Sequence, residues 1–397
     1  MLVNVPRLQA KLDQEGLDGL VATTYVNLLY LTDIESVGLF MFPHAAQAYA
    51  VVTRDEPEKP FYVSSVGELD QTLDAVVGLQ GAIGYGTFFR ETLAGVSLSD
   101  EEQFLRRISV EATPARTPLE ALVVALEEMG LANKKVGVDE QGLVPGYFEQ
   151  LSEQIQGEVY PASAIFQWIR MVKTKEEIRR IRHSARITER ALVAVKGIVR
   201  PGVSEYEIAR EFERSIVSQG GRPKFALIRF GRNGIAGQVE PDNTRLQPGE
   251  TIWFDVGCTY QGYWSDLARI FSLGDPGARM RRFYQAMLVG EDAGIAAAKP
   301  GLTAGELFDL TVEAVREAGV SHYKRHHVGH GIGAAVYDAP LLASGVDIPL
   351  EEEMVINIET PYYEFGFGAV HVEDPFVVRA DGNVLLTDLS RDLHVID

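Results

Sequence analysis

Two pairs of acidic residues in the second half of the chain are the strongest candidates for chemistry. Asp255 and Asp266 lie in residues 251–271, where two arms rich in β-branched and aromatic residues flank a turn, which predicts a β-hairpin. If Tyr260 and Gln261 form a two-residue loop, Asp255 stands directly opposite Asp266. Like charges in this position destabilise a sheet, so the pair needs a counter-charge, which a metal ion would supply. The alternative is a longer loop, a shifted register and one solvated aspartate.

A second acidic pair has the same arrangement, and a sequence repeat relates the two. Glu359 and Glu373 flank a turn region, and a turn centred on Gly366 places them opposite one another. Upstream, the pattern basic-Pro-Gly-apolar-Ser/Thr-x-x-Glu-apolar occurs at 200–208 and again at 299–307. Each copy predicts a capping box and an amphipathic helix. Two related halves of the chain thus each contribute a facing pair of acids.

His330 lies between the two acidic pairs in the sequence. Gly329 and Gly331 flank it, and their lack of side chains lets the backbone approach whatever the imidazole contacts. Four carboxylates and one imidazole carry too much negative charge for one small cation, but they suit two divalent ions with bridging carboxylates. Oxygen-rich sites with one nitrogen prefer hard or borderline ions, so we expect manganese first, then cobalt, zinc or iron. Such a pair would hold a bridging water, lower its pKa and polarise a carbonyl for attack.

The remaining elements must position these residues. A chain of 397 residues is long enough for two domains. Residues 1–162 alternate strands with helices, which predicts a smaller α/β domain with a partly parallel sheet. The expected strands lie at 19–22, 38–42, 46–53, 60–63 and 136–139. A capping box at Thr174 begins a long amphipathic helix, whose charged face we expect to be solvated, and this helix opens the second domain, residues 163–397.

Composition restricts the possible partners. The net charge of −19 argues against nucleic acid as the main partner, because phosphate binding needs a basic surface and no dense Lys/Arg run is present. We expect no membrane span, since no run of about 18 apolar residues occurs, and no secretory leader. The single cysteine, Cys258, cannot form an internal disulfide and fits a reducing compartment, so we expect a cytoplasmic protein.

The candidate ligands fall into motifs that resemble a known family. The motifs are Asp255-Val-Gly, Asp266-Leu-Ala-Arg269, Gly329-His-Gly-Ile-Gly333, Ile358-Glu359 and Val372-Glu-Asp374. Their order and spacing resemble the five-ligand signature of the pita-bread metallopeptidases, which include methionine aminopeptidase, aminopeptidase P and prolidase. Creatinase is a relative that lacks the metal centre. The resemblance implies an α+β fold, with a pita-bread catalytic domain of pseudo-twofold duplicated halves behind a creatinase-like α/β domain, and it implies a homodimer.

The resemblance also implies roles for individual residues. Asp255 would hold one ion, and His330 and Glu359 the other. Asp266 and Glu373 would bridge the two ions. Glu359 would also take the proton from the nucleophilic water as it attacks.

Four further positions concern catalysis and the substrate, with His326 and Tyr337 as catalytic candidates and Gln238 and His371 as substrate-binding candidates. His326 matches a histidine that lines the substrate site in the prolidase and aminopeptidase P branch; the alternative is a buried structural histidine. At three other positions the family pattern has His, His and Arg, whereas this chain has Gln238, Tyr337 and His371. Gln238 and Tyr337 can still donate hydrogen bonds, but neither is a cation at neutral pH. We therefore expect hydrolysis through the metal pair with an altered substrate preference.

Three functions are hypotheses at this stage. The first is a dinuclear metallopeptidase that cleaves an N-terminal or Xaa-Pro peptide bond by attack of a metal-bridging hydroxide. The second is a creatinase-like hydrolase of a small non-peptide C–N substrate. The third is a catalytically silent peptide-binding protein on the same fold. The presence of all five ligands argues against the third, because a protein that only binds has no need for four mutually repelling carboxylates.

Overall fold

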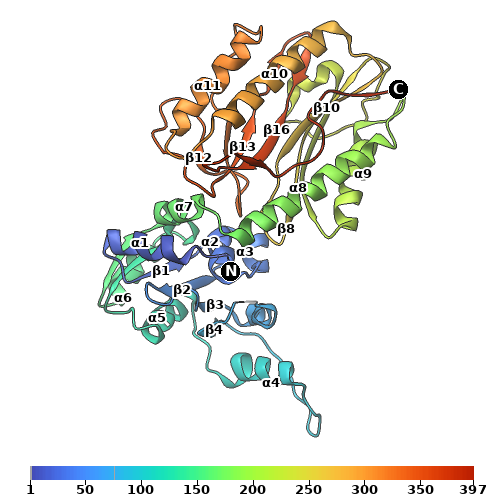
Figure 1. Cartoon of the computed structure of the whole chain (residues 1–397). Helices are drawn as coiled ribbons and strands as arrows, with labels where there is room; N and C mark the ends of the chain where they lie inside the picture. Colours follow the sequence, from blue (N-terminus) through green and yellow to red (C-terminus); the bar gives the residue numbers. More distant parts are fainter. Residues whose placement is uncertain (1, 76) are drawn as a thin grey trace. The chain divides into compact units, whose positions relative to one another are not determined.

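The computed structural model describes residues 2–75 and 77–397. The chain folds into two compact units, Met1–Ile169 and Arg170–Asp397 (Figure 1). The sequence predicts a domain boundary between residues 162 and 163, whereas the two compact units divide between Ile169 and Arg170, within helix α7 (Ser163–Met171). Within the described residues, no helix combines the length and the apolar character needed to cross a bilayer.

The first unit is built on a six-stranded sheet. Its strands are β1 (Gly19–Ala22), β2 (Tyr49–Thr53), β3 (Phe61–Ser65), β4 (Gly81–Tyr85), β5 (Lys135–Val138) and β6 (Glu158–Pro161). They lie in the order β4-β3-β2-β1-β5-β6. The pairs β1–β2 and β2–β3 are antiparallel, and the other three pairs are parallel. The predicted partly parallel sheet is therefore confirmed.

One helix carries much of the apolar core of the first unit. Thr117 caps α5 (Pro118–Glu128) by accepting a hydrogen bond from the backbone N–H of Glu120, and Pro118 begins the helix. Leu122 of this helix packs, fully buried, in one cluster with strand residues such as Val51. The unit also contains α1 (Val5–Glu15), α2 (Tyr25–Thr32), α3 (Val37–Met41), α4 (Asp100–Arg106) and α6 (Tyr147–Gln154).

Helix α3 occupies residues for which the sequence predicts a strand, 38–42, so that prediction is wrong. Ser36 caps the helix by accepting a hydrogen bond from the backbone N–H of Leu39. Over so few residues, periodicity does not separate a buried strand from a short helix. Phe40 and Phe42 are exposed instead of lying in the sheet, so the apolar run does not mark a strand.

The second unit is built on a ten-stranded sheet. Its strands are β7 (Arg222–Phe230), β8 (Thr251–Tyr260), β9 (Tyr263–Trp264), β10 (Leu267–Leu273), β11 (Gly329–Gly331), β12 (Asp338–Leu341), β13 (Val355–Glu359), β16 (Glu373–Val377), β17 (Val384–Leu385) and β18 (His394–Ile396). The main path runs β12-β11-β13-β16-β10-β8-β7 and is antiparallel at every step. The acidic hairpins of the two halves, β8–β10 and β13–β16, therefore meet at the centre of the sheet (Figure 1).

Two pairs of helices, one for each half of the repeat, accompany this sheet. They are α8 (Lys175–Lys196), α9 (Glu205–Ser218), α10 (Gly277–Ala297) and α11 (Ala304–Glu317). α8 packs beside α9, and α10 beside α11 (Figure 1). Ser204 caps α9 and Thr303 caps α11, each in a complete capping box. The two copies of the sequence repeat thus form equivalent helix starts, as predicted.

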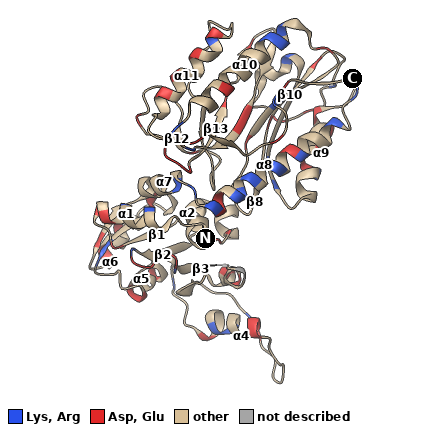
Figure 2. Ribbon diagram, viewed as in Figure 1, with Lys and Arg blue, Asp and Glu red and all other residues tan. Residues whose placement is uncertain are grey.

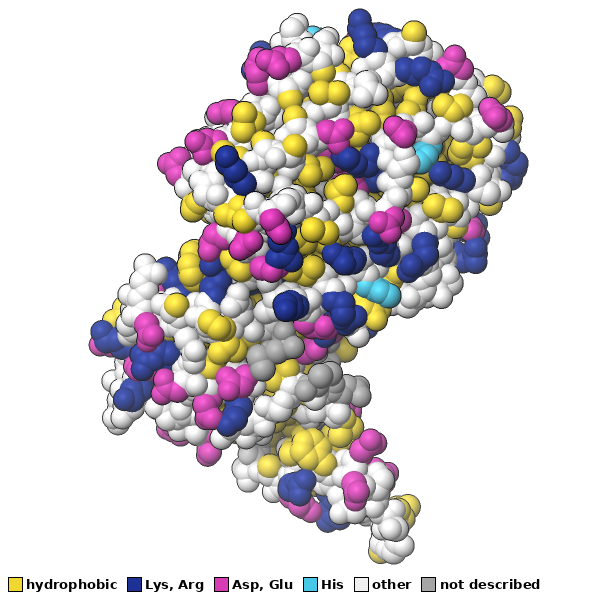
Figure 3. All heavy atoms as spheres, viewed as in Figure 1, with side chains coloured by type: hydrophobic (Ala, Val, Ile, Leu, Met, Phe, Trp, Pro, Cys, Tyr) yellow, Lys and Arg dark blue, Asp and Glu magenta, His cyan; other side chains and the backbone are white. Residues whose placement is uncertain are grey.

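The charged residues of α8 are mostly solvated, although Glu177, Arg180 and Glu189 are buried. Residues of both signs lie along this helix (Figure 2), and Arg179 contacts Glu176 at 2.7 Å with half of the arginine side chain exposed. Exposed pairs of this kind contribute at most about 0.5 kcal/mol. On the face shown in Figure 3, acidic and basic side chains are likewise interspersed with hydrophobic ones. The charges of α8 therefore do not mark a functional site.

A buried ion cluster fixes the start of β12. Asp338 Oδ1 lies 2.9 Å from Arg170 Nη2, and Asp338 Oδ2 lies 3.4 Å from Lys173 Nζ, with all three side chains buried. Burial raises the pKa of Asp338, but the two cations outweigh it, so the net effect is a lowered pKa and an ionised carboxylate.

We expect Asp338→Ala to destabilise the protein by about 3–5 kcal/mol, because it removes the carboxylate that offsets two buried cations. Urea denaturation measures this change. Asp347 is exposed, and Asp347→Ala as a matched control should shift stability by less than about 0.5 kcal/mol. Equal stability of the two variants would contradict the expectation.

Candidate metal centre

The loop of the first acidic hairpin lies one residue later than the sequence predicts. Tyr260 pairs with Tyr263, so Gln261 and Gly262 form the loop. Both loop residues have positive φ, 49° and 78°, as in a two-residue type I′ turn, and glycine adopts this conformation without strain. The predicted loop of Tyr260 and Gln261 is wrong, because it would place tyrosine where the turn requires a positive φ.

This shift changes the partner of Asp255 but not the face on which it lies. Asp255 pairs with Ala268 rather than with Asp266. Moving the loop by one residue moves the pairing by two, and side chains alternate between faces with a period of two. Asp255 and Asp266 therefore stay on one side of the ribbon. Consistent with this, burial and then the charge of Asp255 raise the pKa of Asp266.

The second acidic hairpin has the predicted register. Glu359 at the end of β13 pairs with Glu373 at the start of β16. Between them, β14 (Tyr362–Glu364) and β15 (Gly368–Val370) form a two-stranded extension, and Gly366 at the turn has a φ of 83°. Two buried carboxylates thus face each other across one pair of strands.

His330 enters the site from β11, which lies between β13 and β12. Its Nδ1 lies 2.9 Å from the carbonyl oxygen of Gly331 and donates to it, which leaves Nε2 with a lone pair. Nε2 lies 3.7 Å from Asp266 Oδ2 and 4.0 Å from Glu373 Oε1. Burial lowers the pKa of His330, which keeps the imidazole neutral. This is the form of histidine that binds a metal.

Two glycines make room for β11 between its neighbours. A Cβ atom on Gly329 would stand 2.1 Å from the carbonyl oxygen of Asn357, and one on Gly331 would stand 2.2 Å from that of Ala339. Gly329 also has a φ of 138°, which favours glycine. The glycines that flank His330 therefore allow its strand to lie against backbone on both sides, as their spacing predicts.

We expect Gly329→Ala to lower stability by about 2–4 kcal/mol, because backbone strain and a clash with β13 act together. It should also weaken metal binding, since β11 carries His330 with it when it moves. Thermal denaturation and a metal titration measure the two effects. Gly78 has open space around it and no positive φ, so Gly78→Ala should behave as the wild type. A Gly329→Ala protein with wild-type stability and metal affinity would refute this account.

Two groups of buried side chains could each hold a metal ion, and they share Glu373. The first group is Asp266, His330 and Glu373, and the second is Glu359, His371 and Glu373. In the second group, His371 Nε2 lies 3.3 Å from Glu359 Oε2 and 3.4 Å from Glu373 Oε2. Four of the five predicted ligands thus gather in two adjoining clusters, and the fifth, Asp255, borders the same cavity as Glu359 and His371.

The electrostatics of this site require added positive charge. Burial, with repulsion from neighbouring carboxylates, raises the pKa of Asp255 to about 6 and the pKa values of Asp266 and Glu373 well above the usual range. Within the described residues, Asp266 Oδ1 and His330 Nε2 are buried without a hydrogen-bond partner. Divalent cations would supply the missing charge and bind these donor atoms. The residues present therefore fit the predicted metal ions.

Glu359 differs from the other carboxylates. Burial would raise its pKa, but the imidazoles of His327 and His371 lower it, so Glu359 stays ionised. His327 Nδ1 lies 3.0 Å from Glu359 Oε1, and Arg325 Nη2 lies 3.9 Å from Oε2. His326 was predicted from the sequence to line the substrate site, and His327 was not. Both histidines border the same cavity, and no spacing in the sequence shows which of them reaches Glu359.

Polar residues behind the site position Glu373. Arg269 Nη1 donates to the carbonyl oxygen of Glu373 at 3.0 Å, and Arg269 Nη2 donates to Asp374 Oδ1 at 2.7 Å. Asn357 Nδ2 donates to Glu373 Oε1. Arg269 and Asp374 are fully buried, which explains their place in the sequence motifs. Asn357 was not predicted as a site residue, because nothing in the sequence distinguishes it except its place in a buried strand.

The substrate-site residues predicted from the sequence border a single cavity of about 420 Å³. Such a volume lies within the range of small-molecule sites. The predicted residues on its wall are Gln238, His326, Tyr337, His371, Asp255 and Glu359. Tyr363, Arg325 and His327 lie on the same wall and were not predicted. The structure thus brings two of the predicted ligands, Asp255 and Glu359, and the substrate-site candidates to one place.

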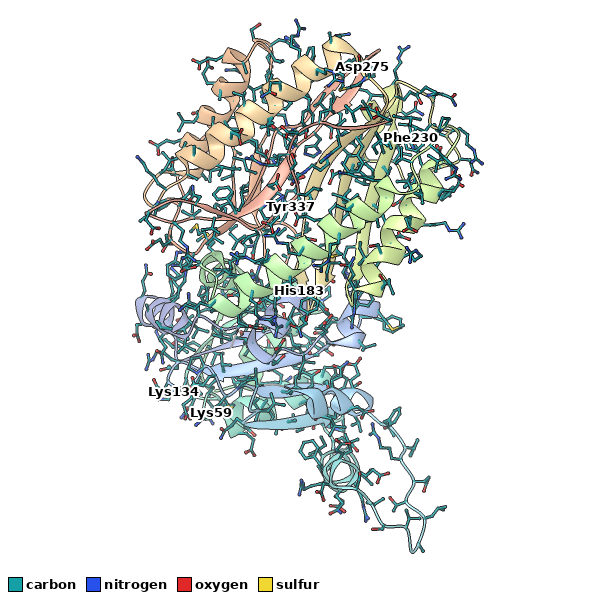
Figure 4. All side chains as sticks on the ribbon, turned by 45° about the vertical axis from the view of Figure 1, so that its right-hand side comes forward. Lys59, Lys134, His183, Phe230, Asp275 and Tyr337 are labelled. Carbon is teal, nitrogen blue, oxygen red and sulfur yellow. The ribbon has the colours of Figure 1, made fainter. Side chains whose placement is uncertain are left out.

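Tyr337 covers the imidazole of His330. The two rings are stacked, with centroids 3.7 Å apart and planes 19° apart, and Tyr337 comes from the loop just before β12 (Figure 4). Its partial burial and the charges of Glu359 and Glu373 raise the pKa of Tyr337 far above its usual range. The hydroxyl therefore stays protonated at neutral pH and donates hydrogen bonds instead of acting as a base.

Comparison with known proteins decides the family. Residues 179–380, about half of the chain, match the model of metallopeptidase family M24. The chain belongs to metallopeptidase family M24. Residues 5–172 match the creatinase/prolidase N-terminal domain. The predicted metallopeptidase with a pita-bread catalytic domain behind a creatinase-like domain is therefore confirmed.

Relatives of this M24 chain extend over both units. An Xaa-Pro dipeptidase of Lactobacillus delbrueckii subsp. lactis is 31% identical over 264 residues, which cover 65% of this chain and 72% of the relative. An uncharacterized peptidase of Bacillus subtilis (strain 168) is 26% identical and is matched over 99% of this chain and 100% of its own. Among solved structures, an Xaa-Pro dipeptidase from Bacillus anthracis has a TM-score of 0.78 at 24% identity and covers 98% of both chains. That structural likeness shows a shared fold.

Proposed function

We propose that this M24 metallopeptidase is an Xaa-Pro dipeptidase, which hydrolyses the bond between an N-terminal residue and a following proline. The observation that carries the proposal is the position of two predicted metal ligands, Asp255 and Glu359, on the wall of a cavity of about 420 Å³, which has room for a small peptide. Relatives named Xaa-Pro dipeptidase support this choice of substrate. We assign catalysis to the second unit, because the site residues lie within it.

The residues of the chain would divide the work of hydrolysis as follows. Two divalent ions, when bound, polarise the scissile carbonyl and make water a nucleophile at neutral pH. Glu359 accepts the proton that the attacking water loses and then delivers it to the leaving nitrogen of proline. His327 Nδ1, 3.0 Å from Glu359 Oε1, holds that carboxylate in place. Asp255, Asp266, His330 and Glu373 would hold the ions together with Glu359.

Neutral donors would hold the substrate. Gln238 and Tyr337 lie on the wall of the cavity and donate hydrogen bonds to the carbonyl groups of the peptide. His326 lies on the same wall and offers a ring nitrogen to the substrate. Because neither Gln238 nor Tyr337 is a cation, the negative charge that develops on the carbonyl oxygen must be offset mainly by the metal ions.

A substrate panel tests the proposal. Manganese-loaded protein is offered Xaa-Pro dipeptides, matched Xaa-Ala dipeptides and peptides that begin with methionine, and the released amino acids are measured. We expect the Xaa-Pro dipeptides to be cleaved fastest. A folded protein that takes up metal but cleaves none of these peptides, or prefers Xaa-Ala, would overturn the assignment.

The residues at positions 238, 337 and 371 favour a second candidate function. Gln238, Tyr337 and His371 stand where the family pattern has His, His and Arg, and all three border the cavity. The replacement of two imidazoles and a guanidinium by an amide, a phenol and an imidazole fits a small non-peptide amide or amidino substrate, which is the second hypothesis from the sequence. Small amides therefore belong in the panel, and turnover of these alone would favour this candidate.

Metal identity, assembly and location are finer proposals. The five ligands of the family signature, four carboxylates and the imidazole of His330, favour manganese, which metal analysis of the purified protein tests. We also propose a homodimer, on the family resemblance, which sedimentation velocity tests. A cytoplasmic location is proposed because the single cysteine, Cys258, is buried and forms no disulfide.

A further inference from the structure

His371 stands where the family pattern has an arginine, and its surroundings are those of a metal ligand. The side chain is 2% exposed. Its Nε2 lies 3.3 Å from Glu359 Oε2 and 3.4 Å from Glu373 Oε2. One ligand atom from each of the three side chains lies within 4.8 Å of the other two, so one ion placed among them can reach all three.

Packing fixes the orientation of the His371 ring. Trp253 is almost completely buried and stacks on it, with centroids 5.7 Å apart and planes 23° apart. Neither nitrogen of His371 makes a hydrogen bond within residues 2–75 and 77–397. A ring that is held by an aromatic neighbour, with a nitrogen directed at two carboxylates, is preorganised for a cation.

An arginine at position 371 would act differently. A guanidinium keeps its protons and has no lone pair, so it supplies a fixed counter-charge and cannot bind a metal. A neutral imidazole supplies a lone pair and no charge. The residue in this chain therefore exchanges a permanent cation beside Glu359 and Glu373 for a donor atom, which makes these carboxylates more dependent on the charge of a metal ion.

We propose that His371 is a metal ligand beside Glu359 and Glu373, so that the centre has two imidazoles, those of His330 and His371, for its two ions. The five-ligand signature contains only the first of these imidazoles. A second nitrogen donor shifts the metal preference from manganese toward cobalt and zinc, because imidazole suits the later ions better than carboxylate does.

X-ray absorption of the zinc-loaded protein counts the imidazoles directly. With both histidines bound, the average is one imidazole per zinc; with His330 alone it is one half. We expect the higher value in the wild type and the lower value in His371→Asn. His322 lies outside the cavity, with Nε2 2.9 Å from the hydroxyl of Tyr362, and His322→Asn as a matched control should keep the wild-type count. A wild-type average of one half overturns the proposal without reference to any variant.

Metal selectivity gives a second, independent readout. Calorimetric titrations with zinc and with manganese compare the wild type with His371→Arg, which restores the residue of the family pattern. Loss of a group that merely orients a ligand costs about 10–100-fold in affinity, so loss of a ligand should weaken binding of one zinc ion by at least tenfold. Manganese binding should change less. Equal losses for both metals, or no loss, would contradict a ligand role. Neither experiment uses a peptide, so each outcome is independent of the proposed substrate.

Discussion

Glu359→Gln is expected to reduce turnover at least about 10³-fold while the protein stays folded, because one substitution removes both a metal ligand and the group that accepts the proton of the attacking water. An amide has nearly the same shape as the carboxylate but does not take up that proton. The variant also loses the contact of a charged group with His327 Nδ1 at 3.0 Å. Steady-state kinetics at saturating metal measure the effect, and circular dichroism reports the fold.

The matched control for this prediction lies on the next strand of the same hairpin. Glu364 pairs with Arg279 at 2.5 Å and does not line the cavity of Glu359. Glu364→Gln should therefore retain turnover within a factor of about two, as expected for a surface ion pair. Undiminished turnover in Glu359→Gln would refute its assigned role, whereas equal losses in both variants would point to damage to the hairpin itself.

The second large effect concerns how the protonation of Asp255 and the binding of metal change the stability of the protein. We expect Asp255→Asn to stabilise the metal-free protein relative to the wild type, with a gap that widens as the pH rises from 5 to 8. Burial raises the pKa of Asp255 to about 6 in the folded protein, above its value in the unfolded chain. The folded state thus binds more protons between these two pKa values, so stability is lost as the pH rises through 6. An amide at position 255 does not titrate, so the variant does not lose stability in this way.

Bound metal should reverse this order of stability, so that the wild type becomes more stable than Asp255→Asn. Cations compete with protons for the carboxylates, so metal binding strengthens with pH and stabilises the wild type. At pH 8, excess manganese should raise the melting temperature of the wild type by about 5 °C or more, and that of Asp255→Asn by clearly less.

Thermal melts at pH 5 and pH 8, with and without manganese, provide the test. Histidines with lowered pKa values, such as His330 and His394, titrate in both proteins and cancel in the difference. Asp347→Asn, at an exposed aspartate, should show no gap from the wild type at either pH. A gap between Asp255→Asn and the wild type that narrows as the pH rises, or equal rescue of both proteins by manganese, would rule out the proposed linkage.

Much of the candidate site could be predicted because it depends on local rules. Residues Glu359 and Glu373 face each other as predicted, since a turn at Gly366 leaves one register in which both apolar arms are buried. The capping boxes at Ser204 and Thr303 begin helices as predicted, because capping depends on residues three positions apart. Such features are determined by side chains that are close in the sequence.

The register of the first hairpin shows the limit of these rules. The alternation of apolar and polar residues determines which face Asp255 and Asp266 share, and a period of two leaves that face unchanged when the register moves by two residues. The choice between Tyr260-Gln261 and Gln261-Gly262 as the loop depends on which residue accepts a positive φ. The face was therefore predictable, and the partner of Asp255 was decided by the folded turn.

The sequence by itself determined the candidate ligands, their place in two acidic hairpins and the family of the chain, because these depend on residue identity and short-range spacing. Only the tertiary structure decided that His327 rather than His326 faces Glu359, and that His371 lies between Glu359 and Glu373 against Trp253. The contacts of His371 with Trp253 and of His327 with Glu359 join segments that are far apart in the chain. Which side chain is buried where such segments meet depends on the packing around it, and no local pattern records that.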